Sequence, residues 1–185
     1  MGNLVTKTGT AVAKPVVEDN QQYLTFMLGG EVFAIGILSI KEIIEYGHLT
    51  TVPLMPEHIR GVINLRGAVV PVIDLSARFG RAGAETTRRT CIVILEVQNG
   101  DGEASGHQDI GIVVDAVNEV VEIPASQIEP APAFGAHIRT DFIQGMGKVS
   151  ERFVIILSVD HVLSIEELAA LEHLHGSMQS SAAPA

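Results

Sequence analysis

The stretch Ile59–Phe79 constrains the fold more than any other part of this 185-residue chain. Two apolar runs rich in Val and Ile, Val62–Leu65 and Ala68–Ile73, are separated by Arg66-Gly67. Short β-branched runs on either side of a two-residue link that contains Gly are typical of a tight β-hairpin. Arg66 at the tip of such a hairpin is either a solvated turn residue or a charge held out for a partner.

Short strands joined by tight turns recur along the chain. Gly29-Gly30 separates two alternating segments, and paired glycines permit the positive φ angles of a type I′ turn. Ser150-Glu151 is predicted to join a later hairpin over residues 142–148 and 152–159. Further strands are predicted over residues 90–97, 110–114 and 119–123. About ten short strands indicate an all-β protein that forms one large barrel or sandwich, or two five-stranded barrels. The polar link Arg81–Arg89 near the middle favours two halves.

Helical segments are few and short. The stretch Ile37–Tyr46 is ambiguous, because its isoleucines fit a helical stripe but the segment is short and β-branched. We expect a helical turn near 37–40 followed by a strand over 41–46. Asp74 is expected to cap a single turn over 75–79. Ser164 and Glu167 form a capping box, which predicts a terminal helix over 165–174. Residues 1–20 and 175–185 are predicted to be disordered tails.

Composition excludes several classes of function. The formal charge of −10 argues against nucleic acid and anionic membranes as partners, and no apolar run approaches the ~20 residues that a membrane-spanning helix needs. The single cysteine, Cys91, suits a reducing cytoplasm. The chain has neither a phosphate-binding loop nor a nucleophile elbow, and no metal-ligand spacing. These absences favour a binding module without a cofactor, although a catalytic or ligand-binding β-barrel with dispersed site residues stays open.

The hairpin sequence also carries a family resemblance. Ile59-Arg60-Gly61-Val62-Ile63-Asn64-Leu65-Arg66-Gly67, followed by Pro71-Val72-Ile73-Asp74-Leu75, resembles the signature of the CheW family of chemotaxis coupling proteins. The segments Phe26–Ile35, Ile40–Ile43 and Gly111–Val117 are similar to further family segments, as are the closing strands near Phe142–Met146 and Ile155–Leu157. The resemblance extends from Tyr23 to Leu174.

The resemblance implies a fold and a role. The expected fold is two five-stranded, SH3-like β-barrels that share an apolar core, the first over about 24–80 and the second over about 88–160, within a CheW-like domain over 21–174. The expected role is that of a non-enzymatic cytoplasmic adaptor. It would bind the cytoplasmic tip of methyl-accepting chemoreceptors and the regulatory domain of a CheA-type histidine kinase in membrane-associated arrays. An adaptor for another output, such as twitching motility or surface sensing, remains an alternative.

Individual family positions carry over to this chain. The resemblance places receptor binding at Arg66, Glu42, Ile40, Ile37 and Gly61. We interpret Asn64 and Gly67 as the residues that shape the turn presenting Arg66. The kinase-binding surface is expected on the second barrel around residues 111–121, a region that includes Gly111, Val113, Val117 and Val120. An apolar groove with Arg66 and Glu42 at its rim would suit a helical receptor tip.

Overall fold

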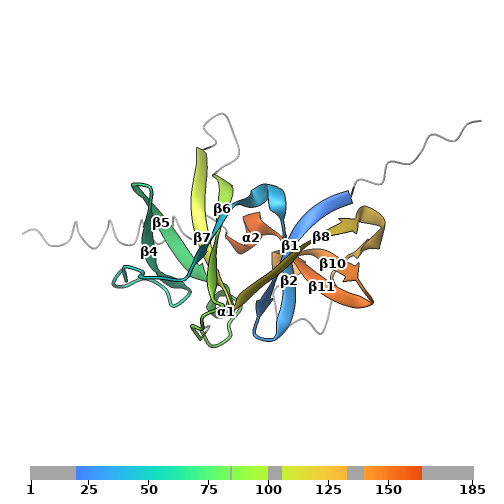
Figure 1. Cartoon of the computed structure of the whole chain (residues 1–185), viewed down its shortest axis with the longest axis horizontal. Coiled ribbons are helices and arrows are strands. Elements are labelled where there is room, and N and C mark those ends of the chain that lie inside the picture. Colours follow the sequence, from blue (N-terminus) through green and yellow to red (C-terminus); the bar gives the residue numbers. More distant parts are fainter. Residues whose placement is uncertain (1–19, 84, 100–105, 133–139, 164–185) are drawn as a thin grey trace, which may run out of the picture.

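Two β-sheets make up most of the computed structural model, which describes residues 20–83, 85–99, 106–132 and 140–163 (Figure 1). The first sheet has six strands in the order β8-β1-β2-β11-β10-β9. Their bounds are β1 Asn20–Leu28, β2 Glu31–Gly36, β8 Ala116–Pro124, β9 Ile128–Glu129, β10 Ile143–Val149 and β11 Arg152–Leu157. The second sheet has five strands in the order β3-β6-β7-β5-β4. Their bounds are β3 Ile40–Glu45, β4 Ile59–Leu65, β5 Ala68–Asp74, β6 Cys91–Asn99 and β7 Gly106–Val114.

The helices of the described residues are single turns; four of them lie between strands, and α2 follows the last strand. They are η1 Ile37–Ser39, α1 Leu75–Arg78, η2 Ala125–Gln127, η3 Thr140–Phe142 and α2 Val159–Val162. The helical turn before β3 and the turn after Asp74 are confirmed. Asp74 caps α1, because its carboxylate accepts a hydrogen bond from Ala77 N at 3.2 Å. No helix among the described residues has the length and apolar character to cross a membrane.

The predicted hairpins are confirmed, and their turns have the backbone that the sequence indicates. Gly29 and Gly30 have φ angles of 56° and 82° between β1 and β2. Arg66 and Gly67 have φ angles of 52° and 87° between β4 and β5. Ser150-Glu151 likewise turns β10 into β11 with positive φ angles. Positive φ at both central positions matches the right-handed twist of the flanking strands.

The division of the chain into a first barrel over 24–80 and a second over 88–160 is wrong, because the sheets interlace. The β1–β2 hairpin pairs with β8 and, in parallel, with β11, so it belongs to the sheet formed by the end of the chain. The middle strands β3 to β7 form the other sheet, in which β5 and β7 are also parallel. Parallel pairs join segments far apart in sequence, and local patterns carry no information about such pairing.

The two sheets share one apolar core, which confirms an all-β fold of two SH3-like barrels. The largest buried cluster contains residues of both sheets, such as Phe26 and Phe33 from one and Leu95 and Ile112 from the other. Two smaller clusters fill the individual barrels. Across the shared core, the rings of Phe26, Phe33, Phe79 and Phe142 follow one another with centroid separations of 6.1, 5.7 and 6.0 Å. Such ring pairs add stability beyond their buried area.

Several finer expectations differ from the structure. The strand predicted over 119–123 begins earlier, because β8 starts at Ala116, directly after a bend at Asp115. The short strand β9 and the turns η2 and η3 are elements that the sequence did not predict. The terminal helix over 165–174 and the tail over 175–185 lie outside the described residues. So does the first tail up to residue 19, whereas Asn20 already begins β1.

Candidate functional site

The tip of the β4–β5 hairpin positions Arg66. Both turn residues adopt left-handed backbone, which Gly67 tolerates freely and Arg66 does not. The Asn64 side chain fixes the turn, because its Oδ1 accepts a hydrogen bond from Gly67 N at 2.9 Å. The Arg66 side chain extends away from the hairpin and is 74% exposed. The turn therefore holds an arginine outward at the cost of backbone strain.

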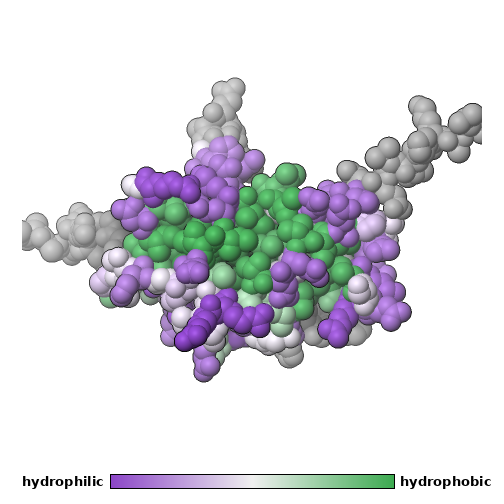
Figure 2. Space-filling view, in the orientation of Figure 1, coloured by the Kyte–Doolittle hydropathy of each residue, from purple (hydrophilic) through white to green (hydrophobic). Residues whose placement is uncertain are grey.

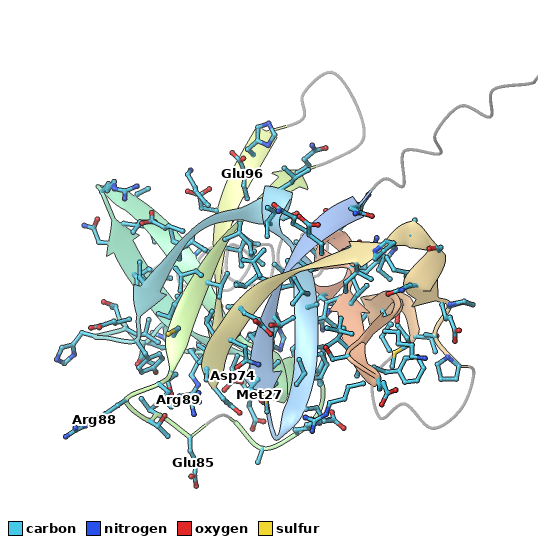
Figure 3. The ribbon with its side chains drawn as sticks, turned by 45° about the vertical axis from the view of Figure 1, so that its right-hand side comes forward. Met27, Asp74, Glu85, Arg88, Arg89 and Glu96 are labelled. Carbon is cyan, nitrogen blue, oxygen red and sulfur yellow. The ribbon has the colours of Figure 1, made fainter. Side chains whose placement is uncertain are left out.

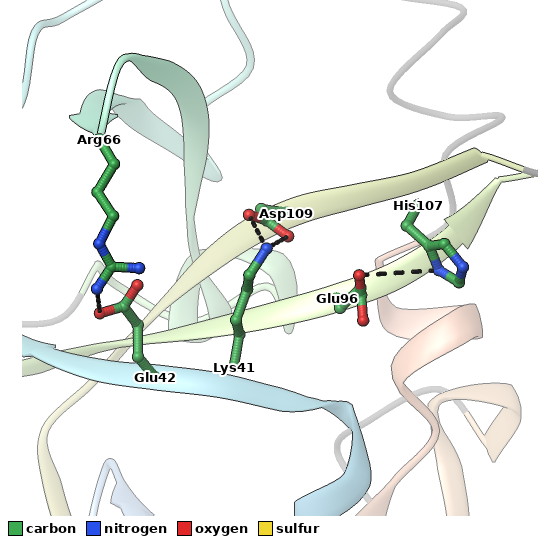
Figure 4. A network of polar contacts seen from close by, with 6 residues as sticks. All are labelled: Lys41, Glu42, Arg66, Glu96, His107 and Asp109. Atoms are coloured by element: carbon green, nitrogen blue, oxygen red, sulfur yellow. Dashed lines mark hydrogen bonds and ion pairs between the residues drawn. The ribbon is translucent and has the colours of Figure 1, made fainter.

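Arg66 reaches across to Glu42 on β3. Its Nη2 lies 3.0 Å from Glu42 Oε2 (Figure 4). Because β3 and β4 are the two edges of the five-stranded sheet, the pair bridges the edges that must approach each other for this sheet to close. Glu42 Oε1 is buried without a hydrogen-bond partner among the described residues. An exposed ion pair contributes about 0–1 kcal/mol, and an unpaired buried oxygen reduces that further, so stability alone does not account for this pair.

Gly61 lies on β4 next to a bridge between this strand and the segment that follows β3. Thr50 and Val62 exchange two backbone hydrogen bonds of 2.9 Å each beside it. Gly61 has a φ of 153°, and an added Cβ would overlap the carbonyl oxygen of Thr50 and lie 3.0 Å from its carbonyl carbon. Any side chain here would push the 50–62 bridge apart, and with it the strand edges that Arg66 and Glu42 span.

An apolar surface adjoins this ion pair. Ile37 and Ile40 are half-buried and pack against the shared core. Leu38, between them on η1, is 98% exposed, and Ile43 on β3 is 43% exposed. In the space-filling view, hydrophobic surface crosses the middle of the molecule and is bordered by hydrophilic side chains (Figure 2). The sequence analysis did not single out Leu38. Its position could have indicated exposure, because on a one-turn helix it points to a different side from Ile37 and Ile40.

The region expected to bind the kinase does not form one surface. Gly111 and Val113 are buried in β7, and an added Cβ at Gly111 would meet Ile92 at 2.8 Å, so neither residue can contact a partner directly. Val117 is half-buried and Val120 is 53% exposed, but both belong to β8 of the other sheet. The reason is that β7 is covered on both faces, as its nearly continuous apolar sequence allows.

Arg60 occupies the base of the same hairpin and is a structural residue. Its Nε and Nη2 lie 2.9 and 2.8 Å from Oδ2 of Asp74, a carboxylate that is 1% exposed, and its Nη1 lies 3.4 Å from the Tyr46 hydroxyl. Burial lowers the pKa of the Arg60 guanidinium, but the hydrogen bond and charge of Asp74 outweigh it and raise the pKa overall. Asp74 also caps α1, so this one carboxylate joins β4, β5 and the helix.

A second set of charges lies on the outer face of the same sheet. Lys41 Nζ binds both oxygens of Asp109, at 2.8 and 3.1 Å, and His107 Nδ1 lies 4.0 Å from Glu96 Oε1 (Figure 4). The hydrogen bond that Lys41 donates to Asp109 raises the pKa of Lys41. The described residues contain no group of three or more His, Cys, Asp or Glu side chains able to hold a metal ion.

Comparisons with known proteins identify the family to which this chain belongs. A family model described as "CheW-like domain" matches residues 22–167. That match covers well over half of the chain. The chain belongs to the CheW family. Its expected signature segments, including the Arg66 hairpin, all lie inside the matched range.

Relatives and a solved structure agree with this assignment. "Chemotaxis protein CheW" of Klebsiella aerogenes is 36% identical over 154 residues, which cover 83% of this chain and 88% of that protein. "Protein FrzA" of Myxococcus xanthus is 29% identical over 115 residues, 62% of this chain and 67% of that protein. The crystal structure of the scaffolding protein TtCheW from Thermoanaerobacter tengcongensis superimposes with a TM-score of 0.67 at 34% identity, covering 76% of this chain and 85% of that one.

Proposed function

We propose that this protein is a non-enzymatic adaptor that couples methyl-accepting chemoreceptors to a CheA-type histidine kinase. Its membership of the CheW family supports this role, as do relatives named as chemotaxis proteins and a solved relative named as a scaffolding protein. In this proposal the protein acts in the cytoplasm, within arrays formed by membrane receptors, and needs no cofactor.

The observation that carries the proposal is the arginine held at the β4–β5 tip beside apolar surface. Arg66 and Glu42 supply two charges at one rim, and exposed Leu38 with half-buried Ile37 and Ile40 supplies apolar contact area. A helix with one apolar face can dock on such a surface, while the charges at the rim set its orientation. We assign the receptor tip to this surface.

Gly61 supports the same surface indirectly. Its lack of a side chain lets the 50–62 bridge close, which brings the edges carrying Arg66 and Glu42 together. We infer that a larger residue here weakens receptor binding through displacement of β4, with no direct contact between residue 61 and the receptor. In this proposal the kinase domain binds a different surface from the receptor tip. Of the four residues first expected to form the kinase-binding surface, Val120 is the exposed one.

A binding experiment tests the proposal. The wild-type chain should be retained by an immobilised receptor hairpin tip and, separately, by the kinase regulatory domain. Arg66→Ala should lose most of its retention on the receptor tip and keep its retention on the kinase domain. Arg88→Ala is the matched control, because Arg88 is an exposed arginine whose side chain points away from the molecule (Figure 3). Failure of the wild type to bind either partner would overturn the proposal.

A second candidate is an adaptor for another chemosensory output. The similarity to "Protein FrzA", a relative that is not named as a chemotaxis protein, favours keeping it. Twitching motility and surface sensing are outputs of this kind. Deletion of the gene followed by separate assays of swimming and of movement on surfaces distinguishes the two candidates.

A further inference from the structure

A cavity of about 430 Å³ adjoins the core of the six-stranded barrel. That core is a small cluster of buried residues, separate from the core that the two sheets share. Val32, Val121 and Val149 line the cavity and also pack against this cluster. The cavity therefore has an apolar floor that is continuous with the barrel interior. We call it the barrel mouth.

Two charged side chains of opposite sign stand at the barrel mouth. On β11, Val154 belongs to the core cluster and Arg152 lies two residues before it. On β8, Val121 packs against the cluster and Glu119 lies two residues before it. Residues two apart in a strand share a face, and Arg152 and Glu119 both line the cavity. Each therefore lies at the edge of the apolar floor.

Local structure fixes the backbone of both charged residues. The Thr25 hydroxyl donates a hydrogen bond to the Glu119 carbonyl at 2.8 Å and accepts one from Glu119 N at 3.3 Å, where the register of β1 and β8 shifts. Arg152 directly follows Ser150 and Glu151, which have φ angles of 47° and 64°. Such left-handed backbone is costly for residues other than Gly, and strain of this kind is concentrated at functional sites.

Glu119 and Arg152 are not neutralised within the molecule. In the part of the chain that the structure describes, neither side chain forms an ion pair or a hydrogen bond, with the other or with any third residue. Glu31 also lines the cavity, but its carboxylate is bound by Arg81 at 2.6 Å. The barrel mouth therefore offers one free carboxylate and one free guanidinium beside an apolar floor.

These three features together fit a zwitterion with an apolar body. The planar guanidinium of Arg152 suits a carboxylate, which it can hold through two nitrogens. The Glu119 carboxylate suits an ammonium group, and the valines suit an apolar side chain. The cavity volume lies within the range of roughly 300–1,000 Å³ that is usual for small-molecule sites. A free α-amino acid with a large apolar side chain carries all three groups.

A second cavity beside the same core shows what the charges add. It has a volume of about 260 Å³ and is lined by Gln21, Tyr23, Ile123, Ala125, Ile128 and Gln144. Tyr23 and Ile123 belong to the core cluster, so this cavity also has an apolar wall. None of its lining side chains is charged at neutral pH. An uncharged apolar molecule could enter either cavity, whereas a zwitterion finds matching charges only at the barrel mouth.

We propose that the barrel mouth binds a free amino acid with a large apolar side chain, with the ammonium group at Glu119 and the carboxylate at Arg152. Arg66, Glu42 and Leu38, which we assign to the receptor tip, do not line this cavity. The site therefore goes beyond the proposed adaptor role, and either proposal can fail without the other.

L-Tryptophan is a suitable probe, because the chain contains no Trp and indole fluorescence then reports the ligand alone. Wild-type protein titrated into dilute L-tryptophan should move its emission to shorter wavelength as the ring leaves water. Tryptamine lacks the carboxylate and indole-3-propionate lacks the ammonium group, so each should bind about tenfold more weakly. Absence of a shift with L-tryptophan overturns the proposal. Equal affinity for the three probes also overturns it, because the charges then contribute nothing.

Single substitutions assign each charge of the ligand to its partner. Arg152→Ala should weaken binding of L-tryptophan and indole-3-propionate about tenfold and leave tryptamine unchanged. Glu119→Gln should weaken L-tryptophan and tryptamine and leave indole-3-propionate unchanged. Lys148→Ala and Glu122→Gln are the matched controls, because these residues lie on β10 and β8 but outside the cavity lining. A variant that weakens all three probes alike overturns the assignment, since it then acts through the fold.

Amide chemical shifts locate the bound ligand. Addition of L-tryptophan should cause its largest shifts at Thr25, Val121 and Arg152, which surround the barrel mouth. Shifts that gather around Gln144 instead overturn the proposal in favour of the second cavity. If L-tryptophan does not bind but Arg152→Ala loses retention on the kinase domain, the proposal is overturned in favour of a protein partner at this site.

Discussion

The base and the tip of the β4–β5 hairpin each carry an arginine paired with a carboxylate, yet the two pairs serve different ends. At the base, Arg60 is 26% exposed and its partner Asp74 is 1% exposed. At the tip, Arg66 is 74% exposed and its partner Glu42 is 22% exposed. The shortest N–O distances are similar, 2.8 and 3.0 Å, so distance alone does not separate the pairs. Burial does: from it we predict that the Arg60 pair stabilises the fold and that the Arg66 pair contributes little to stability.

The largest effect is expected at the base of the hairpin. Arg60→Ala should lower the free energy of unfolding by about 3 kcal/mol, because it leaves the Asp74 carboxylate buried without its cation. Urea denaturation monitored by circular dichroism measures the change. Arg60→Lys is the control and should recover part of the loss, since it restores the charge without the two-nitrogen contact. A loss below about 1 kcal/mol for the alanine variant would place the base pair in the same class as the tip pair.

Gly61→Ala is expected to have the next largest effect. It should lower the free energy of unfolding by about 2 kcal/mol, because the new methyl group meets the Thr50 backbone. Gly67→Ala is the matched control. Gly67 has a φ of 87° and open space around it, so only the backbone cost of about 1 kcal/mol should remain. The two unfolding midpoints in urea measure the difference. Equal losses would mean that the 50–62 bridge yields to the added methyl group without cost.

Arg66→Ala is expected to change stability by no more than about 0.5 kcal/mol, since the exposed pair contributes little and alanine keeps the same left-handed backbone cost. The variant should nevertheless lose receptor capture in the binding experiment above. Unfolding and capture measured on the same preparation test the contrast. If capture falls only in proportion to a loss of folded protein, the tip pair is structural like the base pair.

The smallest effect on stability is expected from the ion pair of Lys41 and Asp109. The hydrogen bond that Lys41 donates to Asp109 raises the pKa of Lys41 above its ordinary value of 10.5. A raised pKa in the folded state means that the contribution of the pair is complete below the unfolded pKa and is lost as the pH rises through the folded pKa. The difference in urea unfolding midpoint between wild type and Lys41→Gln should therefore stay constant from neutral pH to about pH 10 and shrink above it. A difference that grows above pH 10 would contradict this assignment.

The tight turns and the helix cap were predictable from the sequence. Gly29-Gly30, Arg66-Gly67 and Ser150-Glu151 each formed the turn that their residues indicate, and Asp74 capped α1. These features depend on a few neighbouring residues, whose allowed φ angles and hydrogen-bond acceptors are known in advance. The position of Arg66 at a hairpin tip followed from the same reasoning.

Long-range features were not predictable. The β1–β2 hairpin joins strands that lie some 80 to 120 residues later, and the polar link Arg81–Arg89 therefore marks no boundary between barrels. Burial of Gly111 and Val113 depends on which strands cover β7, and the pairing of Arg60 with Asp74 depends on the register of the β4–β5 hairpin. The sequence shows which residues could take part in each contact, but the sheet order decides which of them meet.

The interlaced sheets have a consequence for synthesis on the ribosome. The β1–β2 hairpin ends at Gly36, and its parallel partner β11 ends only at Leu157, about 120 residues later. At roughly 5–20 residues per second, the emerging hairpin waits on the order of 6–24 s before that neighbour exists. Throughout that time Phe26 and Phe33 lack the partners that bury them in the finished molecule. During synthesis the hairpin therefore exposes apolar surface of the kind that chaperones bind.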